Sequence, residues 1–114
     1  MILGGDTVTR LRAPTVTGPD GVPVIDWDSA EAGWSKVDYT GCSFQPLTSS
    51  EDVVAQQRTD STHKAFLPAG ADVLTTDRLR FDGLDYQVDG DPEQWRIRGV
   101  DHHLEVLCFR ITGG

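Results

Sequence analysis

The residues best suited to chemistry form a group of acids and histidines near the end of the chain. Asp101 precedes His102 and His103, and Glu105 follows two residues later. Imidazole and carboxylate groups bind metals and act as general acids and bases. Adjacent strand residues point to opposite faces, so we expect the two imidazoles to diverge instead of sharing a metal. A solvated loop leading into the last strand is the expected structure here.

Other motifs of catalysis or cofactor binding are missing from the sequence. It contains no Cys-x-x-Cys, no His-x-x-x-His, no phosphate-binding glycine loop, and no Gly-x-Ser-x-Gly around Ser49 and Ser50. We therefore expect no catalytic residue, no metal and no cofactor, and the sequence does not predict an enzyme. Several aspartates stand beside Gly or Pro, where turn formation explains them: Asp20, Asp82, Asp89 and Asp91.

The composition is that of a folded globular protein. The chain has 114 residues, of which 38% are hydrophobic and 25% charged, so we expect one domain spanning 1–114 with a single core. No apolar stretch approaches the ~20 residues that cross a bilayer, and no secretion signal is visible at the start. These features predict folding in the cytoplasm and no membrane contact. Cys42 and Cys108 lie among apolar residues and are expected to be buried free thiols.

The formal net charge is −8, which disfavours a dedicated nucleic-acid binder but permits a surface past which DNA slides. One group of bases stands out against this acidity. Arg78, Arg80, Arg96 and Arg98 alternate with apolar residues, which predicts a cationic stripe on the outer face of a sheet. We expect that face to meet acids of a neighbouring subunit or of the same one. The aromatics between these arginines should face the core: Phe81, Tyr86 and Trp95.

Alternation of apolar and polar residues with a period of two, together with turn signals, predicts strands along most of the chain. The clearest segment, residues 72–98, reads as a three-stranded antiparallel meander with turns at 82–83 and 89–92. A final strand, 103–111, is apolar on both faces and should be covered on both sides. Earlier strands are expected at 7–12, 35–45 and 63–67, and residues 24–27 are expected to form either a short strand or an ordered extended segment.

Two details bear on how these strands assemble. The apolar phase changes at Gly41, which predicts a bulge that bends the strand as barrel closure requires. Helix is indicated only over Ser49–Arg58, where a long loop is an equal alternative. The fold expected is mainly β, a small antiparallel β-barrel or sandwich of about six or seven strands with a long inserted loop or short helix.

Several segments, in order along most of the chain, resemble one family. They are Gly41-Cys42-Ser43-Phe44-Gln45-Pro46 with Ser49-Ser50-Glu51-Asp52; Leu67 to Val73 running on to Thr76-Asp77-Arg78; Tyr86 to Trp95; and Asp101 to Val106. The run from Gly21 to Trp27 fits the lead into the second strand. The sequence is similar to the head-to-tail joining proteins of long-tailed bacteriophages, also called head-closure or stopper proteins. The stretch after Trp95 is shorter than in that family.

The resemblance implies a structural virion protein of the phage neck, assembled in the host cytoplasm. It implies a homo-oligomeric ring of about six or twelve copies beneath the portal and adaptor. The ring would close the DNA channel after packaging and dock the tail terminator or tail tube, passing the genome without binding it specifically. The segment 47–60 corresponds to a loop that projects into the channel. Its candidate gating residues are Ser49, Ser50, Glu51, Asp52, Gln56, Gln57 and Arg58.

Two physical expectations accompany this hypothesis. A ring needs heterologous contacts, and open edges of the first or second strand are the natural places for them. A ring of acidic chains would repel DNA from the channel wall, so retention of DNA would need a steric gate. Three alternatives stay open: another ring protein of the neck or tail such as a tail terminator, a nucleic-acid-binding β-barrel, and an enzyme that uses the histidine pair.

Overall fold

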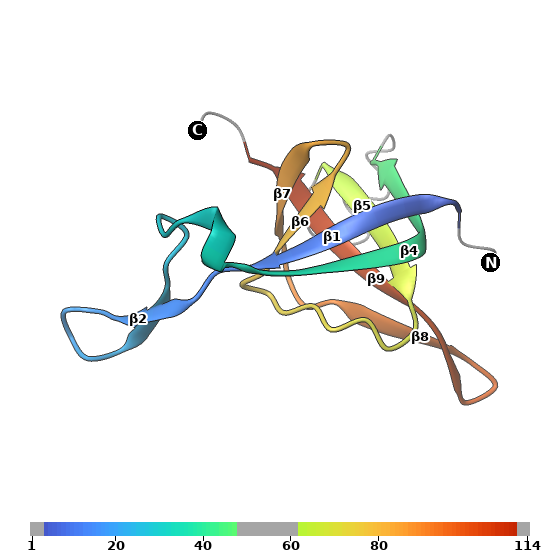
Figure 1. Cartoon of the computed structure of the whole chain (residues 1–114). Helices are drawn as coiled ribbons and strands as arrows, with labels where there is room; N and C mark the ends of the chain where they lie inside the picture. The colour runs from blue at the N-terminus through green and yellow to red at the C-terminus, as the bar shows by residue number, and fades with distance from the viewer. Residues whose placement is uncertain (1–3, 48–61, 112–114) are drawn as a thin grey trace.

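The structure is a computed structural model that describes residues 4–47 and 62–111. Within these ranges nearly all regular structure is β, and the one helical element is a 3₁₀ turn, η1 (Glu31–Gly33) (Figure 1). No helix among the described residues has the length and apolar character needed to span a membrane. The strands are β1 (Asp6–Arg12), β2 (Thr15–Thr17), β3 (Pro23–Ile25), β4 (Ser35–Pro46), β5 (His63–Pro68), β6 (Arg78–Phe81), β7 (Leu84–Val88), β8 (Glu93–Ile97) and β9 (Val100–Arg110).

Seven of these strands form one antiparallel sheet that closes on itself. Its order is β5-β4-β1-β6-β7-β9-β8, and an additional pairing of β5 with β9 joins the first strand to the sixth. Closure removes the exposed edges that an open sheet would present. The predicted small antiparallel β-barrel is therefore confirmed as a six-stranded barrel with β8 attached outside it, and β2 and β3 form a separate two-stranded ribbon.

The barrel interior is filled by the inward-facing residues of the six strands. Along β9, Val106 and Cys108 are buried and alternate with the less buried Leu107, as the period of two requires. Both thiols are free and buried, as predicted. One core residue, Val73, comes from the connection between β5 and β6. The full core cluster is Val8, Cys42, Phe44, Ala65, Leu67, Val73, Leu79, Tyr86, Val88, Leu104, Val106 and Cys108.

The predicted bulge at Gly41 is confirmed. Asp6 pairs with Cys42 whereas Val8 pairs with Tyr39, so β4 carries one extra residue between these pairs. Gly41 has φ +69°, a left-handed conformation that costs glycine little and other residues more. The extra residue brings Cys42 and Phe44 back to the core face and lets β4 bend between β1 and β5.

The predicted meander over 72–98 is correct for its first hairpin and wrong for its last strand. β6 and β7 pair through a tight turn in which Asp82 and Gly83 both have positive φ. β8, however, pairs with β9 and not with β7. After β7 the Asp89 N–H donates to the Leu107 carbonyl at 2.8 Å, so the chain continues along the same edge of β9 instead of reversing. The 11-residue β9 is long enough to pair with β7 and β8 in succession.

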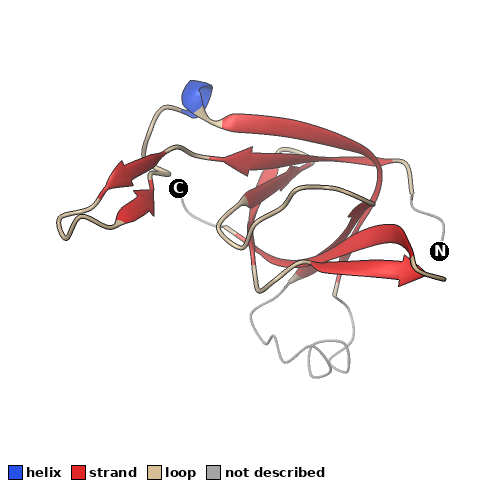
Figure 2. Cartoon of the chain, turned by 90° about the horizontal axis from the view of Figure 1, so that it is seen from below, coloured by secondary structure: helices blue, strands red, loops and turns tan. Residues whose placement is uncertain are grey.

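The first strand is paired on both sides over residues 9–11, which corrects the expectation that it is an open edge. β1 is hydrogen-bonded to β4 on one side and to β6 on the other. The open edges near it belong instead to the ribbon of β2 and β3, which projects from the barrel as an arm (Figure 1). Seen from below, the arm and the hairpin of β8 and β9 lie at opposite ends of the molecule (Figure 2).

Candidate assembly surfaces

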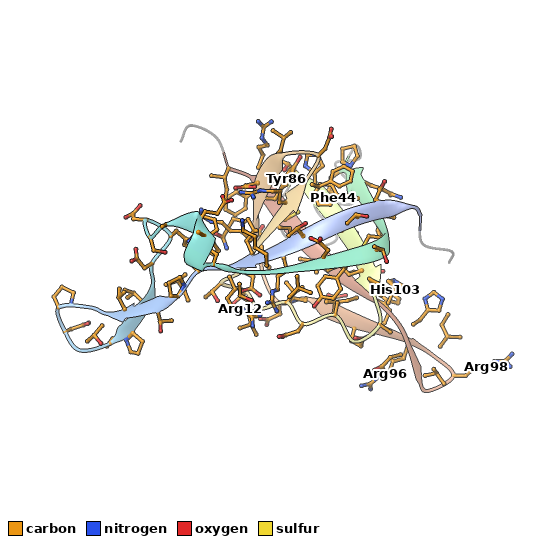
Figure 3. All side chains as sticks on the ribbon, viewed as in Figure 1. Arg12, Phe44, Tyr86, Arg96, Arg98 and His103 are labelled. Carbon is orange, nitrogen blue, oxygen red and sulfur yellow. The ribbon has the colours of Figure 1, made fainter. Side chains whose placement is uncertain are left out.

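The four arginines predicted to form one stripe lie in two separate places. Arg78 and Arg80 are on β6, whereas Arg96 is on β8 and Arg98 follows it. β6 pairs with β7, whereas β8 pairs with β9 beyond the end of β7, so β6 and β8 are not neighbours in the sheet. Figure 3 shows Arg96 and Arg98 on the hairpin that projects from the barrel. The single stripe is therefore not formed, and the role of these residues in subunit contacts stays a prediction.

The arginines of β6 are engaged within the same chain, at the base of the arm. Arg80 donates from Nε to Asp85 Oδ1 at 2.6 Å and from Nη2 to Glu31 Oε1 at 2.8 Å. Both contacts raise the pKa of Arg80, and the hydrogen bond with Asp85 has the larger effect. The Arg78 guanidinium lies 4.1 Å from the ring centroid of Trp27, and its burial lowers its pKa. Both arginines hold the segment that follows the arm against the barrel.

The base of the arm is also braced by aromatic and backbone contacts. Trp27 and Trp34 pack edge to face with centroids 5.0 Å apart. The Trp34 Nε1 donates to Ser29 Oγ at 3.0 Å, and the Asp26 N–H donates to the Pro14 carbonyl at 2.8 Å. The arm is thus fixed where it leaves the barrel, so its direction is set by the fold.

Beyond this base, the arm presents an apolar face to solvent. Val16 pairs directly with Val24, which places both on one face of the ribbon, and Val22 lies two residues before Val24 on the same face. Val16 is 45% exposed, Val24 is 47% exposed and Val22 is 53% exposed. An isolated two-stranded ribbon is only marginally stable in water, so a projecting apolar ribbon is typical of a segment that packs against something else.

The hairpin of β8 and β9 presents a second apolar face. Ile97 pairs with Val100 around a two-residue turn, Arg98 and Gly99, in which both residues have positive φ. Ile97 and Val100 are 52% and 69% exposed, and Trp95, on the same face of β8, is 47% exposed. The prediction that Trp95 faces the core is therefore wrong, because β8 lies outside the barrel. Phe81 and Tyr86 do pack in or against the core, as predicted.

These two hairpins carry most of the exposed large apolar side chains of the described residues. Eight such side chains are at least 37% exposed, and six of them are on the two hairpins. Single exposed apolar residues are ordinary, but clusters of them mark contact sites. Both clusters escaped the sequence reading, although Thr15-Val16-Thr17 and Pro23-Val24-Ile25 flank a turn signal that could have revealed the first hairpin.

The two histidines converge, which contradicts the expectation that they diverge. Trp95 pairs with His103 and Arg96 with Asp101, so His102 is an extra residue on β9 and the alternation fails there. The Nδ1 atoms of His102 and His103 lie 2.7 Å apart. A chain of polar contacts continues from His103 Nε2 to Glu105 Oε2 at 2.9 Å and from Glu105 Oε1 to Lys64 Nζ at 3.0 Å.

This polar chain is compact and internally satisfied. His103 is buried, and its ring stacks on Trp95 with an interplanar angle of 4°. Since Glu105 Oε2 accepts a hydrogen bond from His103 Nε2 and Lys64 neutralises the carboxylate, the arrangement serves to bury a histidine at the root of the β8–β9 hairpin. Within residues 4–47 and 62–111, no three or more His, Cys, Asp or Glu side chains are grouped as a metal site would require.

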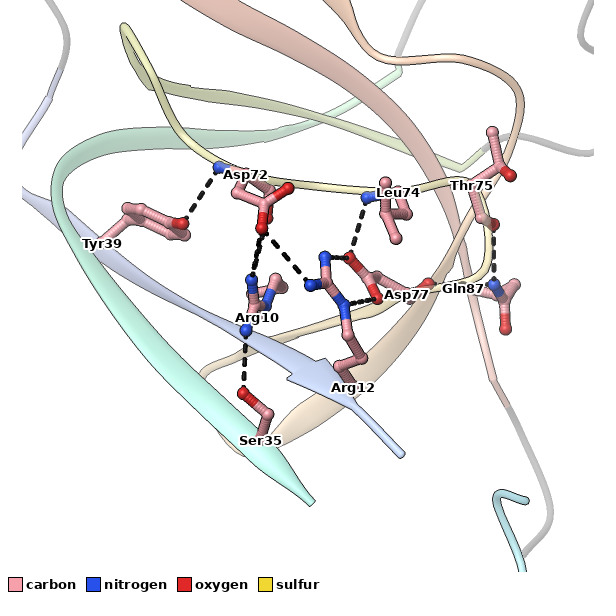
Figure 4. Close-up of polar contacts among 9 residues, drawn as sticks. All are labelled: Arg10, Arg12, Ser35, Tyr39, Asp72, Leu74, Thr75, Asp77 and Gln87. Atoms are coloured by element: carbon pink, nitrogen blue, oxygen red, sulfur yellow. Dashed lines mark hydrogen bonds and ion pairs between the residues drawn. The ribbon is translucent and has the colours of Figure 1, made fainter. Parts of the chain in front are cut away.

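A second polar cluster fastens the connection between β5 and β6 to the barrel (Figure 4). Arg12 donates to both carboxylate oxygens of the fully buried Asp77, at 2.8 and 2.7 Å. Asp77 Oδ2 also accepts the Leu74 N–H at 2.8 Å. Arg10 donates to Asp72 Oδ2 at 3.3 Å and to the Asp72 carbonyl at 3.2 Å. The sequence reading missed this cluster, because its partners lie more than 60 residues apart.

The predicted channel segment, 47–60, falls almost wholly outside the described residues. This holds for all its candidate gating residues: Ser49, Ser50, Glu51, Asp52, Gln56, Gln57 and Arg58. The described residues on either side are joined, since the Leu47 N–H donates to the Thr62 carbonyl at 2.9 Å. Beside this junction lies an aromatic cluster: the Phe44 ring lies 5.3 Å from that of His63 and 4.8 Å from that of Tyr86 (Figure 3).

Together these features define a class: a closed six-stranded antiparallel barrel with two projecting apolar hairpins. The chain matches no protein-family model and no curated protein sequence. Among solved structures it is similar to protein SF1141 from Shigella flexneri 2a, with 17% identity, a TM-score of 0.65, and coverage of 96% of this chain and 93% of that one. This likeness supports the fold alone.

Another solved structure that matches is the protein xkdH of the phage-like element PBSX from Bacillus subtilis. Its identity to this chain is 20%, with coverage of 96% of this chain and 94% of that one, and the TM-score is 0.35. At that TM-score the match carries no argument about the fold or the function of this chain.

Proposed function

We propose that this chain is a phage-related structural protein, namely the head-to-tail stopper that forms a ring in the neck of a long-tailed bacteriophage. The observation that carries the proposal is the concentration of exposed apolar side chains on two hairpins that project from a closed barrel. A barrel with closed edges does not add strands to its neighbours along its wall, so contacts between copies fall to the parts that project.

The sequence supports the particular role. Segments that resemble the head-closure family occur in the expected order over most of the chain, and the acidic balance of −8 suits a ring through which DNA passes without adhering. In this proposal the ring lies under the portal and adaptor and presents its other side to the tail. The involvement of segment 47–60 in closing the channel stays a prediction.

Deletion of the gene from the phage that carries it tests this function. Electron microscopy of the lysate should then show heads that fill and lose DNA beside complete, unattached tails, and expression from a plasmid should restore joined particles. Tails of uncontrolled length would instead indicate a tail terminator. Normal particles from the deletion strain would refute a neck function.

Nucleic-acid binding is tested separately with the purified chain. The acidic charge predicts no measurable affinity for single-stranded DNA at 0.15 M salt. An affinity that falls steeply as salt is raised would favour the nucleic-acid-binding barrel over the stopper.

A further inference from the structure

We propose that copies of this chain associate head to tail, with the apolar face of the β2–β3 arm of one copy packed on the apolar face of the β8–β9 hairpin of the next. This inference rests on the proposed ring function and names the two surfaces that would form the ring. Each surface is described by three side chains: Val16, Val22 and Val24 on the arm, and Trp95, Ile97 and Val100 on the hairpin.

The positions of the two surfaces favour repeated contacts over a closed pair. The molecule measures 45 × 28 × 28 Å, and the arm and the hairpin project at opposite ends in both views (Figures 1 and 2). A contact between two different surfaces at opposite ends leaves one of each free after every addition. Such a chain of contacts closes into a ring when the rotation between copies divides a full turn.

The charges at the tips of the two hairpins favour the contact of an arm with a β8–β9 hairpin over the contact of two arms or of two β8–β9 hairpins. Asp20, in the turn of the arm, accepts a hydrogen bond from the Val22 N–H and makes no ion pair within the described residues. Arg98, in the turn of the hairpin, likewise has no partner among those residues, whereas Arg96 is paired with Asp101 at 2.6 Å. Two arms would bring carboxylates together and two hairpins would bring guanidinium groups together. An arm on a hairpin brings opposite charges together.

The backbone of each hairpin suits a rigid contact. The arm is anchored at its base by the Trp27–Trp34 pair and by Arg78, so its apolar face is held in a fixed direction. The hairpin is anchored by the stacking of Trp95 on the buried His103. Because these contacts fix the base of each element, association has less of the chain to order than the docking of two free loops would.

The experiment uses the full-length chain with one charge placed on each apolar face. We expect the wild-type chain to self-associate in sedimentation velocity as its concentration rises toward roughly 1 mM, and Val24→Glu and Ile97→Glu each to remain monomeric alone, since a buried unpaired charge opposes association. A 1:1 mixture of the two variants should form a heterodimer and nothing larger, because only the arm of Ile97→Glu and the hairpin of Val24→Glu remain intact.

A matched control separates this contact from general loss of apolar surface. Leu74 is 49% exposed and lies outside both hairpins, so Leu74→Glu should associate like the wild type. Charge reversal gives a second test: Asp20→Arg and Arg98→Asp should each weaken association about tenfold or more, and the double variant should recover most of the loss. Aspartate is tolerated at the positive φ of Arg98, so this substitution should not disturb the turn.

Three results would overturn the inference: self-association of Val24→Glu or Ile97→Glu alone, absence of a heterodimer in their mixture, or a wild-type chain that stays monomeric throughout. These outcomes are distinct from failure of the proposed function. Head-to-tail association together with normal particles from the gene-deletion strain would refute the neck role and leave the contact standing. Missing necks together with no arm–hairpin contact would refute the contact and leave the role standing.

Discussion

The cluster of two arginines and two aspartates allows burial to be tested as the factor that decides the strength of an ion pair. Asp77 and Asp72 both contact Arg12, but the Asp77 side chain is 0% exposed and that of Asp72 is 64% exposed. Asp77 binds Arg12 through two oxygens at 2.8 and 2.7 Å, whereas Asp72 contacts it at 3.3 Å. We predict that Asp77→Ala destabilises the protein much more than Asp72→Ala.

The expected magnitudes follow from these contacts. Asp77→Ala leaves the Leu74 N–H without its acceptor and Arg12 without its bidentate partner, and loss of one member of a buried pair costs roughly 3–5 kcal/mol. Because the Arg12 side chain is 28% exposed and water can reach it, the lower end applies, about 3 kcal/mol. Asp72→Ala removes the contacts of a carboxylate that is 64% exposed and screened by water, and the buried Arg10 keeps the Asp72 carbonyl and Ser35 Oγ as acceptors. We therefore expect a loss of about 1 kcal/mol or less.

The assay is urea unfolding followed by circular dichroism. With a slope of about 1.5 kcal/mol per molar urea, Asp77→Ala should lower the midpoint by about 2 M, and Asp72→Ala by less than about 0.7 M. Asp77→Asn should be intermediate, since the amide oxygen can still accept from the Leu74 N–H. Equal losses for Asp77→Ala and Asp72→Ala, within about 0.5 kcal/mol, would refute the reasoning that burial sets the strength of this cluster.

Three further predictions concern a carboxylate, a glycine and the thiols. Hydrogen bonds from Arg80 and, to a smaller extent, from Lys36 lower the pKa of Glu31 from 4.5 to about 2. The folded state therefore binds a proton at Glu31 less readily than the unfolded state does. The stability from Glu31 is therefore full above about pH 5 and is lost gradually as pH falls to about 2. In pH-dependent unfolding, the free energy of unfolding of Glu31→Gln should lie below that of wild type above about pH 5, and this difference should shrink to nothing by about pH 2. Gly41→Ala should cost about 1 kcal/mol in urea unfolding, through its positive φ alone, because a Cβ there meets nothing within 4 Å. Burial raises the pKa of Cys108 to about 12, so at pH 8 a thiol reagent should label it only after unfolding.

Each of these three has a matched control. Gly33 also has open space around it but no positive φ, so Gly33→Ala should be nearly neutral, and an equal loss at Gly33 and Gly41 would contradict the strain argument. For Glu31, the free energy of unfolding of wild type and of Glu31→Gln should differ by an amount that changes with pH. A difference that stays constant from pH 6 to 2 would show that titration of Glu31 is not its source. For the thiol, a Cys42→Ser variant isolates Cys108, and rapid labelling of its native state would contradict the burial.

Local sequence patterns predicted a large part of the barrel. Alternation placed β1, β5, β6, β7 and β9 close to their observed bounds, since a strand with one buried face must repeat every two residues. The change of phase at Gly41 located the bulge of β4 for the same reason. The Asp82-Gly83 dipeptide located a turn because both residues tolerate positive φ.

The positions of most strands and turns, the β class of the fold and the negative net charge therefore follow from the amino-acid sequence without the structure. Tertiary structure decided which strands pair, since pairing depends on contacts between residues far apart. β8 pairs with β9 and not with β7. This pairing exposes Trp95, separates Arg96 from Arg78 and forms the projecting hairpin. The extra residue at His102 likewise turns two diverging imidazoles into neighbours, because a bulge is a property of the pair of strands and not of either strand alone.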